Sequence, residues 1–278
     1  MRSTLAALTA LFMVVWSGVA AAASGRLKLL TYNIAGLPDG FMTAHPSANM
    51  PQIGPLLAHY DLALIQEDFA YGVSLRKSVS LPFQSPAFER GQRLHFGDGL
   101  SQFAVRAFAP LQREPWRACH GVVDSYFDCL TPKGFTSTRQ LLAEGVEVDV
   151  YNVHLDAGPG REDQLAREAQ VEQLAEAIAQ RSQGRPVILA GDTNIRAQRD
   201  LLTRFEQATG LVDVCETLHC PDASRIDRAF FRSSPTLKLR ARRWSIDRRF
   251  VDRNGRPLSD HLAVAVELDW QTNEPSSP

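Results

Sequence analysis

Six short polar clusters in this sequence combine side chains that bind hard metal ions with side chains that transfer protons. Each cluster adjoins an apolar run typical of a buried strand. In chain order they are Thr31-Tyr32-Asn33, Gln66-Glu67-Asp68, Asn152-Val153-His154, Gly191-Asp192-Thr193-Asn194, Arg225-Ile226-Asp227 and Ser259-Asp260-His261. Carboxylate and amide oxygens suit Mg²⁺ or Ca²⁺, and histidines suit proton transfer or phosphate binding. The pattern predicts strands that deliver these groups to a common pocket.

Two of the clusters predict groups for a metal site. Glu67 follows the apolar run 62–65, so its carboxylate lies at the rim of a buried sheet, where a cation offsets the cost of desolvation. The amide of Asn33 ends another strand and can reach a metal or its bound water. Each residue also has an ordinary structural interpretation, namely a salt bridge from Glu67 to an arginine and an Asn33 side chain that closes a turn.

Two further clusters predict groups that handle water and phosphate. Asp192 and Asn194 follow an apolar strand, so the carboxylate can orient or deprotonate water while the amide donates to a phosphate oxygen. His154 ends the strand 148–153 and can donate to phosphate and stabilise developing charge. The structural alternatives are a helix N-cap at Asp192 or Asn194 and a buried, hydrogen-bonded histidine.

The last two clusters predict a histidine oriented by a carboxylate. Asp260 and His261 directly precede a strand, where neighbouring side chains point to opposite sides, so both reach one ligand only if the site encloses the strand start. Asp260 can then bind the metal while His261 addresses the scissile group. Asp227, on another strand, is the natural partner to orient His261.

The elements that must position these groups alternate between strands and helices. Strands are predicted at 27–33, 62–66, 102–108, 134–139, 146–154, 187–190, 226–231, 237–242 and 262–268, and helices at 53–59, 161–181 and 199–208. Residues 71–99 read as irregular because Pro and Gly interrupt them. Several strands follow one another without a helix between them, which favours an α/β sheet sandwich over a simple βαβ array.

Length and charge limit the class of protein. The 278 residues, 44% of them hydrophobic, fit one large domain or two small ones. A formal net charge of -1 provides no overall basic field for nucleic acid, although a local basic patch would suffice. No linker divides the chain, so residues 24–270 are predicted to form one domain, followed by a disordered tail at 271–278.

The N-terminal residues 1–23 have the pattern of a signal peptide. A basic residue precedes an apolar stretch too short to span a bilayer, and small residues follow it. We therefore expect a secreted or periplasmic protein with no transmembrane segment in its mature part, the alternative being an uncleaved anchor. In an oxidising compartment the four cysteines favour two local disulfides, Cys119 with Cys129 and Cys215 with Cys220. Structural zinc is the alternative, because His120 and His219 adjoin cysteines.

The ordered clusters together resemble the endonuclease/exonuclease/phosphatase superfamily, over roughly residues 27–268. The resemblance implies an α/β fold, a four-layer αββα sandwich of two packed mixed β-sheets like that of pancreatic deoxyribonuclease. It also implies roles for eight residues: metal binding by Asn33, Glu67 and Asp260, and catalysis by His154, Asp192, Asn194, Asp227 and His261. The implied cofactor is Mg²⁺, with Mn²⁺ or Ca²⁺ as alternatives, and His261 acts as general base or charge stabiliser.

The sequence departs from the family pattern at two positions. Asp68 stands where an apolar residue is usual, which predicts either a bend in the strand or a more negative metal site. Thr193 replaces a commoner aromatic residue, which affects packing more than chemistry. Because no catalytic group is lost, we expect an active enzyme.

The resemblance is closest to the neutral sphingomyelinase branch, on His154-Leu155, Gly97-Asp98-Gly99-Leu100 and Lys133-Gly134-Phe135. The expected activity is therefore a phosphodiesterase with a phospholipid headgroup as substrate, acting as a monomer with no stable protein partner. The sequence offers no aromatic hairpin for a membrane surface, and Phe83, Phe88 and Phe96 read as local packing. An extracellular nuclease is the alternative if the basic face of Lys238, Arg240 and Arg242 borders the cleft. Phosphomonoesterase activity and a non-catalytic binding module are less favoured.

Overall fold

The computed structural model describes residues 22–41, 45–86, 97–122, 128–196, 198–221 and 225–273. The predicted signal peptide therefore lies outside the described residues except for its last two positions. Twelve strands and five α-helices are present within this part of the chain. The helices are α1 (Pro46–Leu56), α2 (Gly72–Ser78), α3 (Arg161–Arg181), α4 (Arg199–Thr209) and α5 (Val214–Thr217), and a 3-10 turn (Leu57–His59) follows α1.

The strands form two six-stranded mixed sheets that pack face to face. The first sheet has the order β11 (Leu237–Ile246), β12 (Val264–Thr272), β1 (Ser24–Asn33), β2 (Leu62–Gln66), β4 (Ser101–Ala104) and β3 (Phe83–Gln84). The second has the order β5 (Gln112–Pro115), β6 (Gly134–Ala143), β7 (Val146–His154), β8 (Val187–Asp192), β10 (Asp227–Arg232) and β9 (Val212–Asp213). Two adjacent pairs, β1 with β2 and β7 with β8, are parallel.

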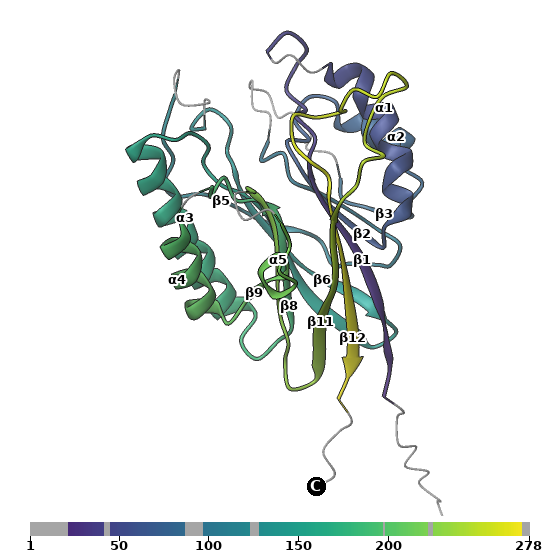
Figure 1. The fold of residues 1–278 in the computed structure, drawn as a ribbon, viewed down its shortest axis with the longest axis vertical. Coiled ribbons are helices and arrows are strands. Elements are labelled where there is room, and N and C mark those ends of the chain that lie inside the picture. Colours follow the sequence, from purple (N-terminus) through teal and green to yellow (C-terminus); the bar gives the residue numbers. More distant parts are fainter. Residues whose placement is uncertain are drawn as a thin grey trace, which may run out of the picture.

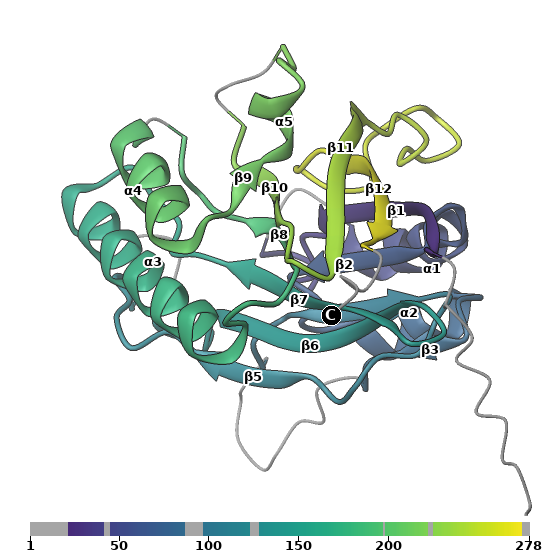
Figure 2. The ribbon, with the colours of Figure 1, turned by 90° about the horizontal axis from the view of Figure 1, so that it is seen from below.

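Helices cover the outer face of each sheet, which gives the four-layer αββα sandwich implied by the resemblance (Figure 2). Three apolar clusters fill the spaces between the four layers. Leu29 and Ile188 lie between the sheets, Ile53 of α1 packs against the first sheet, and Ile178 of α3 packs against the second. The central strands are apolar on both faces because each face is covered, which explains their continuous apolar sequence runs.

Several element boundaries differ from the sequence prediction. The expected irregular stretch contains α2 and β3, and α2 is too short at seven residues to show a helical period. Helix α1 begins at Pro46 and contains Pro51 and Pro55, and burial of Met50 and Ile53 outweighs their cost. The strand predicted at 102–108 ends at Ala104.

The predicted start of the disordered tail, at residue 271, was also wrong. Strand β12 continues to Thr272, because pairing of its last residues with Ser24 of β1 and Leu237 of β11 extends the ladder. The Thr272 hydroxyl also accepts a hydrogen bond from the backbone nitrogen of Ala23 at 2.8 Å. Residues 274–278 lie outside the described part of the chain, as do Phe88 and Phe96.

Candidate active site

The strand order brings all six polar clusters to one edge of the sandwich. Parallel pairing places Asn33 beside Gln66, and His154 beside Asp192. The antiparallel strand β10 starts at this edge, so Asp227 pairs with Asp192. The loop that carries residues 259–261 leads into β12, which is antiparallel to β1 and therefore starts at the same edge. The predicted convergence of strand ends follows from these registers.

Glu67 reaches this edge through an unusual backbone conformation. Its φ is 58°, in the left-handed region that non-glycine residues rarely occupy. The carbonyl of Glu67 accepts backbone hydrogen bonds from Gly36 at 3.0 Å and from Phe69 at 2.8 Å, which hold this turn. A Cβ at position 36 would lie 2.2 Å from that carbonyl oxygen, so the contact requires glycine there. Two loops thus fix the direction in which the Glu67 carboxylate points.

Asn33 connects the two carboxylates at the centre of the site. Its Nδ2 donates to Glu67 Oε1 at 2.9 Å and to Asp192 Oδ2 at 3.1 Å. Its Oδ1 accepts from the backbone nitrogen of Ala35 at 3.0 Å, which fixes the orientation of the amide. Both polar ends of the Asn33 side chain are therefore engaged by protein groups.

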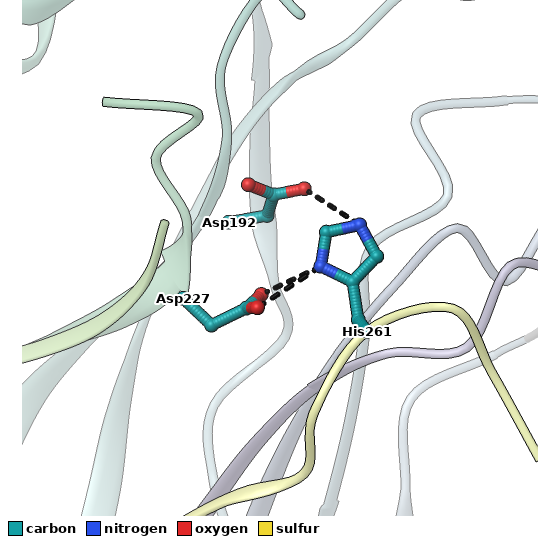
Figure 3. Close-up of side chains that lie close together, drawn as sticks. All are labelled: Asp192, Asp227 and His261. Atoms are coloured by element: carbon teal, nitrogen blue, oxygen red, sulfur yellow. Dashed lines mark hydrogen bonds and ion pairs between the residues drawn. The ribbon is translucent and has the colours of Figure 1, made fainter. Parts of the chain in front are cut away.

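His261 lies between two aspartates, one on each ring nitrogen (Figure 3). Nδ1 lies 3.0 Å from Asp227 Oδ2, and Nε2 lies 3.6 Å from Asp192 Oδ2. Asp227 therefore lies where the sequence predicted a carboxylate that orients His261. The backbone nitrogen of His261 donates to Ser259 Oγ, which itself donates to the carbonyl of Asn33 at 2.7 Å. This chain of bonds ties the loop before β12 to the end of β1.

The pair of aspartates controls the protonation of His261. Burial by itself lowers the pKa of His261, but the negative charges of Asp192 and Asp227 outweigh it and raise this pKa to about 10. Burial raises the pKa of Asp227 to about 6, against the lowering effect of its hydrogen bond to His261. In the metal-free protein His261 is therefore a cation at neutral pH.

His154 has the opposite protonation state. It is almost completely buried, and burial followed by the positive charges of Lys133 and His261 holds its pKa well below the usual value. Its Nε2 lies 3.5 Å from Asp192 Oδ2 and 3.8 Å from Glu67 Oε1, while Nδ1 has no hydrogen-bond partner among the described residues. His154 is thus a neutral imidazole that faces both carboxylates.

Asn194 and Asp260 complete the predicted set. Asn194 has a φ of 50°, donates through Nδ2 to the carbonyl of Leu155 at 3.0 Å, and gives its backbone N–H to Asp192 Oδ1 at 3.0 Å. Asp260 is exposed and lines the same cavity as Asn194. The structure therefore brings all eight predicted residues to one edge of the sandwich.

These groups border a cavity of about 700 Å³. Its lining includes six of the eight predicted residues, namely Glu67, His154, Asp192, Asn194, Asp260 and His261. Apolar side chains also line the wall, among them Leu37, Phe41, Phe69 and Leu130. The cavity thus combines the polar site with apolar stretches of wall.

Sequence reasoning assigned no role in the site to three basic residues of the cavity. Lys133 is buried and forms an ion pair with Asp128, and Arg167 donates to the carbonyls of residues 156–158. Arg196 is exposed at the cavity wall. Lys133 directly precedes a buried strand, a signal that could have identified it. Arg167 lies within a polar helix, where nothing in the sequence distinguishes it from its neighbours.

The two departures from the family pattern have local explanations. Asp68 pairs with Arg76 at 2.6 Å and accepts from Ser101 Oγ at 2.6 Å, so its charge is balanced away from Glu67. Thr193 donates through its hydroxyl to the carbonyl of Ile226 at 2.7 Å, which joins β8 to the start of β10.

The structure also bears on the disulfides, the basic face of β11 and the membrane-spanning segments considered from the sequence. Both predicted disulfides, Cys119–Cys129 and Cys215–Cys220, are confirmed. The basic face of β11 lies away from the cavity, because Lys238, Arg240 and Arg242 are absent from its lining and Arg242 pairs with Asp269. In the described part of the chain, no helix has the length and apolar character needed to cross a bilayer.

Comparison with known sequences identifies a family and a group of relatives. The profile of the endonuclease/exonuclease/phosphatase family matches residues 30–261. The sphingomyelinase of Mycobacterium tuberculosis is 35% identical over 275 residues, which cover 89% of this chain and 53% of that protein. The chain therefore spans about half the length of the curated relatives it matches.

Solved structures share the fold at low sequence identity. A mutant beta toxin from Staphylococcus aureus with bound magnesium ions is similar with a TM-score of 0.64 and 16% identity, covering 87% of this chain and 99% of that one. TDP2 from D. rerio, complexed with a single-strand DNA product, gives 0.67 and 18%, covering 87% and 98%. At this identity the likeness establishes the four-layer fold.

Proposed function

This chain belongs to the endonuclease/exonuclease/phosphatase family, and on that basis we propose that it is a divalent-metal-dependent phosphodiesterase that hydrolyses a phospholipid headgroup with an activated water. The observation that carries the proposal is the convergence of Glu67, Asp192 and His261, from three distant segments, in the lining of one cavity. A buried group of carboxylates beside a cationic histidine suits the binding and attack of a phosphodiester.

The residues present fit a hard divalent cation, and we propose Mg²⁺. Burial raises the pKa of Glu67, because the surrounding protein groups do not fully offset the cost of removing its charged carboxylate from water. Asn33 holds this carboxylate close to that of Asp192, and a cation would balance both charges. Glu67 is the proposed principal ligand, with the exposed Asp260 contributing from the cavity wall. Asn33, whose amide is already engaged, acts by positioning Glu67.

A second group of potential ligands lies close by, but it suits proton transfer better. Ligand atoms of Asp192, Asp227 and His261 lie within 4.8 Å of one another. The imidazole of His261 already separates the two aspartates and carries a proton that both stabilise. A metal bound there would have to displace that proton, so we place the cation at Glu67. Bound there, it would neutralise phosphate charge and favour attack by water.

The chain's own residues then divide the remaining tasks. Asp192, fixed by the Asn33 amide and the backbone of Asn194, is proposed to orient the attacking water and accept its proton. His261, held by Asp227 and positively charged, stabilises the negative charge that grows on the phosphoryl group and can protonate the leaving oxygen. His154 and Asn194 are proposed to donate to phosphate oxygens. Of the two roles predicted for His261, the geometry supports charge stabilisation over general base.

The substrate proposal rests on the cavity wall and on the relatives. The exposed apolar side chains of Phe41 and Leu130 in the cavity lining fit a lipid better than a nucleic-acid backbone, which binds basic grooves. The nuclease alternative required the basic face of β11 to border the cleft, and that face lies outside the cavity lining. The sphingomyelinase name of the 35% identical relatives makes sphingomyelin the first lipid to test. The two disulfides support the proposal that the protein is exported.

A substrate panel tests this function. The purified chain is assayed with Mg²⁺ or with chelator against short-chain sphingomyelin, DNA, bis-p-nitrophenyl phosphate and its matching monoester. We expect Mg²⁺-dependent hydrolysis of sphingomyelin and of the simple diester, with a loss of roughly a hundredfold or more in Asp192→Asn. Salt-sensitive cleavage of DNA without lipid hydrolysis would support the nuclease instead. Full activity in chelator would contradict the metal-dependent mechanism.

A further inference from the structure

Two exposed apolar side chains line the cavity. Phe41 and Leu130 both belong to its lining, yet they are 68% and 52% exposed. We refer to Phe41 and Leu130 as the apolar rim. Sequence reasoning missed it because its two members come from separate, distant segments of the chain.

The members of the rim come from both halves of the sandwich. Phe41 follows β1 of the first sheet, whereas Leu130 lies between β5 and β6 of the second. Figure 1 shows the connections after β1 and between β5 and β6 reaching the same end of the molecule. Because Phe41 and Leu130 line the same cavity, a surface that contacted both side chains would lie against that cavity.

Isolated exposed apolar residues are common, so their location decides whether they indicate a docking surface. Phe83 and Val105 provide the contrast, because Phe83 pairs with Ala104 and Val105 donates its backbone N–H to Asp61 at 2.9 Å. Both therefore lie beside the start of β2, whereas Glu67 follows its end. Phe41 and Leu130 differ from these because both line the cavity.

We propose that the apolar rim is a docking surface for a phospholipid bilayer, which seats the cavity over a headgroup. The inference rests on the proposed function and adds that the substrate is taken from an assembled membrane. A bilayer is flat enough to meet both loops, and its interior accepts large apolar side chains. Arg196, exposed at the cavity wall with no ion pair among the described residues, complements the phosphates of such a surface.

The test compares binding to bilayers with chemistry on a dissolved substrate. The Phe41→Ala/Leu130→Ala double variant is measured against the wild type, with Phe83→Ala as the control that removes an exposed ring at the other end of β2. Partition onto phosphatidylcholine/sphingomyelin vesicles is measured by flotation with metal chelated. Hydrolysis of those vesicles and of bis-p-nitrophenyl phosphate is then measured with Mg²⁺.

We expect the double variant to lose at least about tenfold in vesicle partition, the loss expected for two large side chains that no longer leave water. Its loss of activity on vesicles should exceed its loss on the dissolved diester by about the same factor. Phe83→Ala should bind vesicles as the wild type does. The single Phe41→Ala variant should show the same selective loss on vesicles, to a smaller extent.

The outcomes separate this inference from the proposed function. A wild type that cleaves the dissolved diester, with a double variant that binds vesicles equally well, overturns the docking surface and leaves the proposed function standing. Equal losses on both substrates also overturn it, because the two residues would then serve the cavity alone. A wild type inactive on every phosphodiester refutes the proposed function, whatever the vesicles show.

Discussion

Replacement of Asp227 by asparagine tests how the charge of His261 is maintained. The substitution keeps the shape of a side chain that lies 3.0 Å from His261 Nδ1 but removes its negative charge. An increase in pKa from 6.5 to about 10 corresponds to a preference for the protonated imidazole of roughly 5 kcal/mol. Asp192 and Asp227 both contribute, so loss of one removes roughly half, about 2–3 kcal/mol.

If that charge stabilises the transition state, Asp227→Asn should lower kcat by roughly a hundredfold while KM changes little. The assay is hydrolysis of bis-p-nitrophenyl phosphate at saturating Mg²⁺ across pH 5–10. An NMR titration of the His261 ring in the metal-free protein provides the second readout. The wild-type ring should stay protonated through pH 8, whereas the variant ring should lose its proton at lower pH.

The same shift predicts how stability depends on pH. Because the folded pKa of His261 lies above the unfolded value of 6.5, its contribution to the free energy of unfolding is complete below about pH 6.5 and lost as the pH rises through about 10. The metal-free wild type should lose more stability over this window than Asp227→Asn does. A kcat within about threefold of the wild type, or a wild-type ring that titrates near pH 6.5, would refute the reasoning.

Three further predictions follow from the site and its supports. Glu67→Gln should raise the Mg²⁺ concentration for half-maximal activity by about tenfold or more, because a negatively charged ligand is lost. The unfolding temperature of the metal-free protein should not fall, because burial already disfavours the charge of Glu67. An unchanged Mg²⁺ titration would exclude Glu67 as a ligand. Gly191→Ala should destabilise the protein by roughly 3 kcal/mol or more in urea unfolding, since its Cβ would lie 2.0 Å from the carbonyl oxygen of Val153; a change below about 1 kcal/mol would contradict this contact. Thiol labelling of the mature protein under denaturing, non-reducing conditions should find no free cysteine, and two or more labelled thiols would overturn the disulfide assignment.

Much of the fold could be predicted because its central strands bury both faces. The run 62–66 is apolar and the run 146–154 has a valine at every second position from 146 to 150, so both could be bounded correctly, and α3 is long enough to show where it starts and stops. Helix α2, with seven residues, is too short for periodicity, and α1 contains two prolines that ordinarily interrupt a helix. Packing against the first sheet stabilises both, and packing is not encoded in local sequence pattern.

The candidate site was predictable as a set of residue types, but its internal arrangement was not. Polar residues at strand ends located Glu67, Asp192 and His261, because strand ends share an edge. The engagement of both ends of the Asn33 amide depends on distances between three segments. The left-handed backbone of Glu67 depends on its contact with Gly36. Neither can be inferred from spacing along the chain.

The most direct test of the central claim is the position of the bound metal ion. Anomalous diffraction from crystals of the protein grown with Mn²⁺ would locate it without any assumption about activity. We predict a peak within roughly 2.5 Å of a carboxylate oxygen of Glu67, on the side that faces the cavity. A fully occupied Mn²⁺ elsewhere, with no density at Glu67, would contradict the account.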